Sequence, residues 1–428
     1  MENQNIRQPP ILKPRFYYGY VIVTAAFLVM LVSWAVINSY GVFFKPLQTE
    51  FRWSAAEISG PFSICMIVNG ILGIAVGMFN DKFGPRIVIT TCGIIMGLGF
   101  LLMSQVNFLW QLYLFAGVLV GTGMAGIWVP QMSTVARWFA KRRSLMTGIV
   151  IAGVGISQMI GPVIIVRLIQ NYDWRFTYLI LGGAVLVVVV AAAQFMKRDP
   201  GRTGQKLDGG EEDREPSLAP RANLFTLREA IRSFRFWITA AIFFCFGYCA
   251  FSILIHLVPH VIHLGIPAVT AANVLATMGI VSIFGTYILG ILGDRIGTQY
   301  VFAIAFFLIM STLFWLLTAR EEWTLYALAA LAGISVGGEG SVESPLVAAL
   351  FGLKFHGLIY GILHVGFTVG AAIGPFLTGY LFDITGEYQA GFLVGGLLGV
   401  VGLILALILK FLGSSASKNS GLASNCYS

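Results

Sequence analysis

Long, uninterrupted apolar stretches dominate this chain of 428 residues. Residues 18–44 and 55–79 each provide the roughly 20 residues that a helix needs to cross the hydrocarbon of a bilayer. Only 11% of the residues are charged, against about 25% in soluble domains. Backbone groups in lipid must be satisfied internally, and the chain lacks the alternating pattern of a β-barrel. We therefore predict an all-α integral membrane protein.

The apolar runs number twelve, and one polar seam divides them into six and six. They lie near residues 18–44, 55–79, 87–105, 109–138, 145–170, 175–196, 235–259, 268–293, 299–318, 323–351, 358–382 and 389–412. We predict a tail (1–17), a six-helix bundle (18–198), a linker rich in charge, Gly and Pro (199–234), a second six-helix bundle (235–412) and a tail (413–428). The first run is too long for a signal-peptide core, so it should remain as the first helix.

Lys and Arg residues are distributed unequally between the two sides that these spans define. Most of the 27 fall in the tails, the linker and the loops on the same side. The other side keeps Lys45, Arg52, Arg167, Arg175 and Arg320. This bias predicts that both termini are cytoplasmic. The net charge of +8 therefore reflects topology, and we expect no nucleic-acid partner.

A sequence repeat with one fixed offset links the two halves. GMFNDKFGPR begins at Gly77 and GILGDRIG begins at Gly290, and Gly161-Pro162 recurs as Gly374-Pro375 at the same separation, which we call the repeat offset. The repeat indicates one ancestral half used twice. The repeat contains Gly77, Asp81, Gly84, Gly290, Asp294 and Gly297, and together with Arg86, Arg137 and Arg295 these residues form a set that we call the gate motif. Gly161, Pro162, Gly374 and Pro375 form a candidate helix hinge.

Two such halves joined by a linker resemble the parallel repeat of the major facilitator superfamily. The resemblance implies twelve helices in two bundles, with substrate bound between them. It also implies that the gate motif latches the halves on the cytoplasmic side. Asp81 could then pair with Arg86 or Arg137, or face the positive N-terminal end of the eleventh span.

Within that superfamily the chain resembles the monocarboxylate porters and the oxalate/formate antiporters. The resemblance rests on residues 17–20 (YYGY), 39–47 (SYGVFFKPL), 137–143, 256–259 and 351–361. It implies transport of an organic anion. Those porters place a cation in the first helix and an Asp and Arg in the eighth, where this chain has Asn38, Ser282 and Thr286. Neutral donors and histidines then become the candidates for the substrate path: Asn38, His256, His260, Ser282, Thr286 and Tyr287.

Acidic and imidazole groups occur within the predicted spans. Glu339 lies near mid-depth of the tenth span, and Glu343 follows one turn later on the same face. Carboxyl groups in a bilayer core are costly and mark substrate or proton pathways. We expect proton coupling at Glu339, Glu343 and His364, with Glu339 the first candidate. The alternative is a structural Glu339 within the segment GGEG.

The prediction is a proton-coupled secondary transporter that moves a small organic anion, a monocarboxylate, by alternating access. The alternative is an exporter or antiporter of amphipathic or weakly basic compounds in the same superfamily. No ATP-binding loop and no nucleophile beside a base occur, so we expect neither a pump nor an enzyme. We expect no cofactor and no metal site. The protein should be a monomer in the inner membrane of the cell, with the organic anion, protons and the lipid bilayer as its partners.

Overall fold

Twelve long apolar helices make up most of the structure. The computed structural model describes residues 17–38, 40–53, 55–200 and 225–424. Twelve helices in these ranges are long and apolar enough to span a membrane, and the described residues contain no strand. The all-α prediction is therefore confirmed. Most of the predicted tail 1–17, most of the predicted linker 199–234 and the last four residues lie outside the described residues.

The first half contains six spans and two short helices. Its elements are α1 (Gly19–Asn38), the single-turn η1 (Tyr40–Phe43), α2 (Phe44–Phe51), α3 (Ala55–Phe83), α4 (Pro85–Met103), α8 (Arg143–Asn171) and α9 (Trp174–Phe195). The fourth span is built from α5 (Leu109–Leu112), the π-helical η2 (Tyr113–Leu119), α6 (Val120–Ala125) and α7 (Trp128–Trp138). That span is therefore irregular, although its ends match the predicted run 109–138.

The second half repeats the arrangement after a short lead-in helix. Its elements are α10 (Leu227–Arg232), α11 (Phe234–His263), α12 (Ala268–Ile296), α13 (Thr298–Leu316), α14 (Glu322–Phe351), α15 (His356–Thr385) and α16 (Gln389–Ser424). Thr226 caps α10, because its hydroxyl accepts from the Glu229 N–H while the Glu229 carboxylate accepts from the Thr226 N–H. Such reciprocal capping starts a helix as short as this one.

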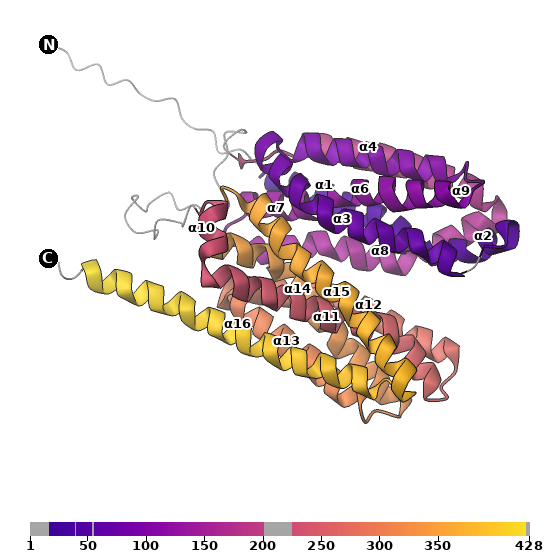
Figure 1. The fold of residues 1–428 in the computed structure, drawn as a ribbon. Coiled ribbons are helices and arrows are strands. Elements are labelled where there is room, and N and C mark those ends of the chain that lie inside the picture. Colours follow the sequence, from indigo (N-terminus) through magenta and orange to yellow (C-terminus); the bar gives the residue numbers. More distant parts are fainter. Residues whose placement is uncertain (1–16, 39, 54, 201–224, 425–428) are drawn as a thin grey trace, which may run out of the picture.

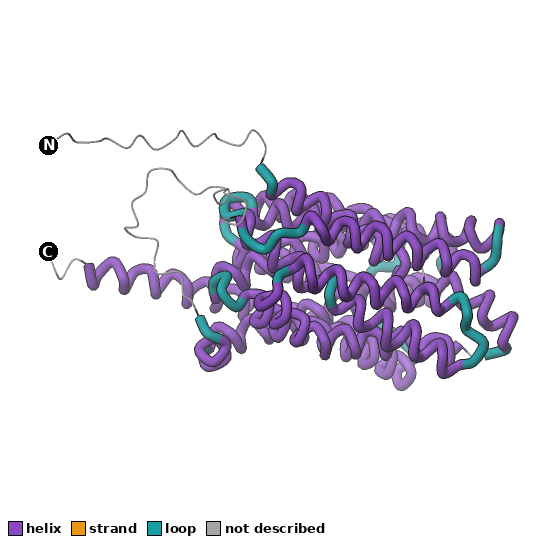
Figure 2. Tube along the Cα trace, turned by 90° about the horizontal axis from the view of Figure 1, so that it is seen from above, coloured by secondary structure: helices purple, strands orange, loops and turns teal. Residues whose placement is uncertain are grey.

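The two bundles approach each other at the end where α10 lies, which we call the linker side. Figure 1 shows the bundles diverging toward the opposite end, which we call the far side. Figure 2 shows the same helices from above, running lengthwise with loops at both ends. Contacts between the halves run from α3 to α15, from α8 to α12 and α14, and from α7 to α14 and α15. These five helices and α7 therefore enclose the interface.

Glycines allow helices to touch within each half. A glycine contact in the first half recurs in the second half at the repeat offset. A Cβ added at Gly161 would lie 3.0 Å from the carbonyl oxygen of Ala35 on α1. At Gly374 it would lie 2.5 Å from the carbonyl oxygen of Tyr248 on α11, and both members of this second contact follow those of the first by the repeat offset. The repeat therefore preserves close packing of helix backbones. α8 and α15 both continue through these glycines.

Candidate functional site

Asp81 joins the two halves on the linker side. Its carboxylate accepts hydrogen bonds from the backbone N–H groups of Gly357 and Leu358, at 3.2 and 2.9 Å. These groups form the N-terminal end of α15, where the helix dipole favours a negative charge. Arg137 of α7 donates to the same carboxylate at 2.8 Å, and both side chains are largely buried. Asp81 thus contacts two of its three suggested partners.

Asp294 makes the same contact in the opposite direction. Its two carboxylate oxygens accept from the N–H groups of Ser144 and Leu145, at 2.7 and 2.9 Å. Ser144 and Leu145 begin α8, and they precede Gly357 and Leu358 by the repeat offset. Each half therefore places one aspartate on the N-terminal end of a helix in the other half.

The remaining gate-motif residues shape the loops around these contacts. Arg86 donates to Gln194 at 2.8 Å rather than to Asp81. Gly84 and Gly297 have φ values of +87° and +100°, a backbone conformation that favours glycine. Arg295 is exposed at the end of α12. A Cβ added at Gly77 would lie only 2.3 Å from the carbonyl oxygen of Gly357, so α3 and α15 touch there.

A buried cluster of polar side chains surrounds Glu343 on α14. His364 Nδ1 lies 2.7 Å from Glu343 Oε1, and the Tyr360 hydroxyl donates to Oε2 at 2.8 Å. Glu343 and Tyr360 are buried, whereas the His364 side chain keeps 19% of its surface exposed. Two residues of α15 therefore hold both oxygens of one carboxyl group.

Trp128 of α7 connects this cluster to the first half. Its indole N–H donates to the Tyr360 hydroxyl at 2.8 Å, and its ring stacks on His364 with centroids 5.7 Å apart. Trp34 of α1 contacts the same indole edge-on, with centroids 5.9 Å apart. The cluster thus lies between the halves, with the ring of Trp128 against α15 and Trp34 behind it.

Several buried polar atoms near this interface have no hydrogen-bond partner among the described residues. They are Glu339 Oε1 on α14, both amide atoms of Gln131 on α7, and the indole nitrogen of Trp34. Glu339 is 3% exposed and interacts electrostatically with Glu343. Leaving polar atoms buried and unpaired is costly, so the Glu339 carboxyl is suited to hold a proton, and the Gln131 amide and the Trp34 indole N–H are suited to bind a ligand.

The predicted substrate-path residues on α12 separate into two faces. Thr286 is buried against α8 and α14, because an added Cβ at Gly148 or Gly337 would meet its backbone, and its hydroxyl bonds within α12. Ser282 lies one turn away and also bonds within the helix. Tyr287 is 54% exposed on the outer face with Phe284, so it does not join the interface. Asn38 ends α1, and its side chain lies outside the described part.

His256 and His260 face the interior of the second half, away from the Glu343 cluster. His256 Nε2 lies 2.9 Å from the carbonyl oxygen of Pro375, which ties α11 to α15. His260 is buried edge-on against Tyr388 and Phe392. The two histidines lie one turn apart on α11, and this part of the helix packs within its own bundle.

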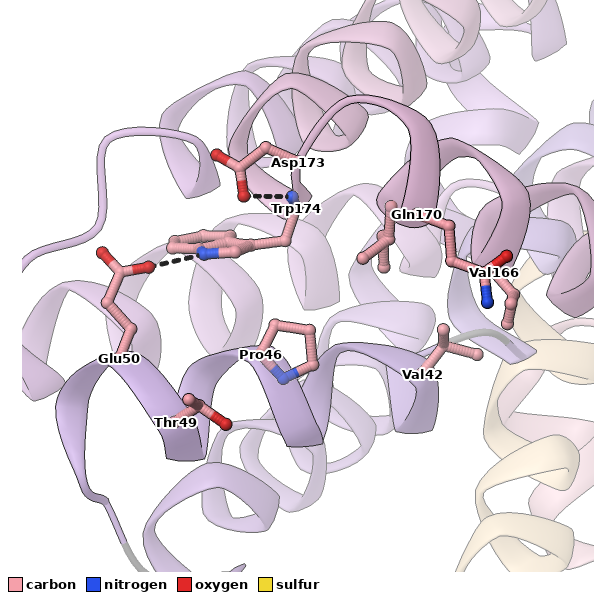
Figure 3. Close-up of a pocket in the computed structure, with 9 residues that line it drawn as sticks. Val42, Pro46, Thr49, Glu50, Val166, Gln170, Asp173 and Trp174 are labelled. Carbon is pink, nitrogen blue, oxygen red and sulfur yellow. Dashed lines mark hydrogen bonds between the residues drawn. The ribbon is translucent and has the colours of Figure 1, made fainter.

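A pocket of about 500 Å³ lies at the far side of the first half, between α2 and the ends of α8 and α9 (Figure 3). Glu50 accepts from the Trp174 indole and from Arg175, both at 2.7 Å, and Asp173 caps α9 at 2.6 Å. Burial alone would raise the pKa of Glu50, but these hydrogen bonds outweigh it and lower the pKa below its usual range. The acidic groups of the pocket are therefore already partnered.

Sequence reasoning did not select Trp34, Trp128, Gln131 or Tyr360 as site residues. The available signal was a Gln and two Trp residues within apolar spans of the first half, where polar side chains are costly. Tyr360 was named only within the range 351–361, which carries part of the resemblance to known porters. Their assembly around Glu343 depends on the contact between the halves, which no single span encodes.

The sequence model of the Major Facilitator Superfamily matches residues 25–321 and 262–424 of the chain. The chain is also similar to Monocarboxylate transporter 13 of Rattus norvegicus, with 30% identity over 91% of this chain and 89% of that protein. The "Uncharacterized MFS-type transporter YhjX" of Escherichia coli (strain K12) is 26% identical over 82% and 84% of the two chains.

A solved structure supports the fold. The transporter FucP, crystallised in an outward conformation, superimposes with a TM-score of 0.70 and 17% identity, covering 91% of this chain and 99% of its own. The family match, the twelve spans and the relatives agree on a multi-pass membrane transporter for small molecules rather than an enzyme. The chain belongs to the major facilitator superfamily.

Proposed function

We propose that this transporter moves a small monocarboxylate together with protons by alternating access between the two bundles. The observation that carries the proposal is the group formed by the buried Glu339 and Glu343 with the partly buried His364 at the interface of the halves. Carboxyl groups at such depth supply proton sites, and an imidazole supplies a donor for an anion. Relatives named as monocarboxylate transporters support the substrate class.

Glu339 is the proposed first site of the transported proton. It is buried, its Oε1 atom has no partner among the described residues, and Glu343 stands one turn away. Two carboxyl groups this close do not both carry a charge readily, so the pair should exchange protons as a unit. A proton on the pair removes one negative charge, which lowers the free energy needed to move the pair between polar and apolar surroundings.

The Asp81 and Asp294 contacts are proposed to hold the linker side closed. The bias of Lys and Arg makes that side cytoplasmic in this proposal, with both termini inside the cell and the protein acting as a monomer in the inner membrane. Rocking of one bundle against the other would break both contacts together, because each joins opposite halves. Substrate then enters from one side at a time.

One observation favours a second candidate, an exporter or antiporter of amphipathic or weakly basic compounds. The unpartnered Glu339 oxygen offers a buried acceptor to a cationic ligand. His364 pairs with Glu343 and so reduces the acidic character of the cluster. This pairing favours an anionic substrate over a cationic one. Competition by hydrophobic cations separates the two candidates.

The test is uptake by proteoliposomes of formate, lactate, oxalate and benzoate under an imposed proton gradient. Glu339→Gln should abolish accumulation while sparing counterflow exchange, because exchange requires no net proton movement. Glu322→Gln, at the exposed start of the same helix, is the matched control and should accumulate like the wild type. Unimpaired accumulation by Glu339→Gln would remove this residue from the coupling, and competition by hydrophobic cations alone would favour the exporter.

A further inference from the structure

We infer that Glu343 occupies the binding site for the carboxylate group of the substrate, and that a proton on Glu343 frees this site for one monocarboxylate. His364 and Tyr360 are the groups that would hold the substrate carboxylate, with the aromatic faces of Trp34 and Trp128 beside it. The inference rests on the proposed function and deepens it. It assigns a position to the substrate carboxylate and names Glu343 as the charged group that competes for that position.

The geometry of the cluster is that of a carboxylate receptor that already holds a carboxylate. His364 contacts one oxygen of Glu343 at 2.7 Å and Tyr360 contacts the other at 2.8 Å. A carboxylate accepts two such bonds side by side, as it does from paired donors elsewhere. The carboxylate of Glu343 thus occupies the position that a substrate carboxylate would take on these two donors.

The charges near Glu343 explain why a proton must accompany the anion. The titratable groups around it are Glu339 on α14 and His356, Tyr360 and His364 on α15, where His356 contacts the Tyr360 ring and the Ser344 carbonyl oxygen, while α7 contributes the uncharged Trp128. A second carboxylate beside an ionised Glu343 would be repelled in this buried setting. One proton on Glu343 removes that charge and releases both donors. Where Glu343 is ionised before binding and His364 keeps its protonation state, binding of one carboxylate therefore takes up one proton.

The position of the cluster also fits an exchange of ligands. His364 is the exposed member of the group, since its side chain keeps 19% of its surface while Glu343 is buried. Trp128 reaches it from the opposite half, so the same site touches both bundles. The neighbouring indole faces of Trp34 and Trp128 suit an apolar acid rather than a second charged group. Lactamide and benzamide, which carry one acceptor oxygen in place of a carboxylate, should not compete.

The test compares the pH dependence of binding in matched variants, measured by counterflow of each acid that the wild type transports. Wild-type affinity should weaken about tenfold for each pH unit of increase once Glu343 is ionised, because one proton binds with each carboxylate. Glu343→Gln should remove that slope, whereas Glu322→Gln should keep it. His364→Ala should weaken binding about tenfold or more, and His263→Ala, on the exposed far end of α11, should not.

A second measurement avoids the risk that a variant fails to fold. Purified wild-type protein in weakly buffered solution should take up one proton for each carboxylate that it binds. A retained pH slope in Glu343→Gln, normal binding by His364→Ala, or binding without proton uptake would overturn the inference while leaving carboxylate transport itself intact. Failure of the wild type to transport any acid of the panel would instead overturn the proposed function.

Discussion

Gly77→Ala should open the linker side of the transporter. The added Cβ would lie 2.3 Å from the Gly357 carbonyl oxygen, whereas ordinary contacts begin near 3.4 Å. Because that oxygen is backbone, α3 and α15 would have to separate by about 1 Å, since packed interiors hold no slack. The bonds of Asp81 to Gly357 and Leu358, now 3.2 and 2.9 Å, lie one turn away and would stretch beyond bonding range.

Each hydrogen bond to a charged group contributes about 1.5–3 kcal/mol, so losing both would cost the closed state about 3–6 kcal/mol. Each 1.4 kcal/mol is about tenfold, so the ratio of closed to open molecules should fall at least about a hundredfold. Gly73→Ala is the matched control on the same helix, because a Cβ there meets nothing within 4 Å.

The assay is a distance distribution between spin labels at Lys141 and Lys354, which are exposed on the linker side of opposite halves. The background carries Cys426→Ser, and the other four cysteines are buried. Gly77→Ala should add a population at longer distance that is absent from Gly73→Ala. Identical distributions for the two variants would refute the claim that this contact holds the linker side closed.

Two further substitutions test the far side and the contact between the halves. Glu50 pairs with Arg175 and has a lowered pKa, so its stabilising contribution is present above its usual pKa and is lost as the pH falls through the lowered value. The melting temperature of Glu50→Gln should therefore lie below that of the wild type at neutral pH and approach it in acid. A difference in melting temperature that does not change with pH would contradict this, as would a similar trend in the exposed control Glu387→Gln. Trp128→Phe keeps an aromatic ring but removes the donor to Tyr360, so carboxylate affinity measured by counterflow should fall about tenfold, and an unchanged affinity would exclude a role for that hydrogen bond.

The sequence repeat predicted a pair of contacts between the halves as well as the fold. The repeat offset relates Asp81 to Asp294, and the structure shows that their partners, Gly357 and Ser144, obey the same offset. Contacts between repeated elements are predictable because both copies inherit the same backbone packing. Hydrophobicity predicted the number and order of the spans, since lipid leaves the backbone few alternatives. It did not predict the end of the first span, because α1 ends at Asn38 and the predicted run 18–44 also includes η1 and the start of α2.

The Glu343 cluster was only partly predictable. Glu343 and His364 were singled out because polar groups are rare in apolar spans, but their pairing depends on how α14 and α15 are rotated against each other. Helix rotation also explains Tyr287, which follows the buried Thr286 by one residue and therefore turns about 100° onto the exposed face. Spacing along one helix predicts which residues share a face, but not what that face meets.

Simultaneous recording of proton and carboxylate fluxes in proteoliposomes tests the central claim most directly. We predict that internal alkalinisation accompanies efflux of each transported acid, with one proton for each carboxylate and no dependence on membrane potential. Carboxylate movement that leaves the internal pH unchanged would contradict the account, because the Glu343 site would then admit the anion without its proton.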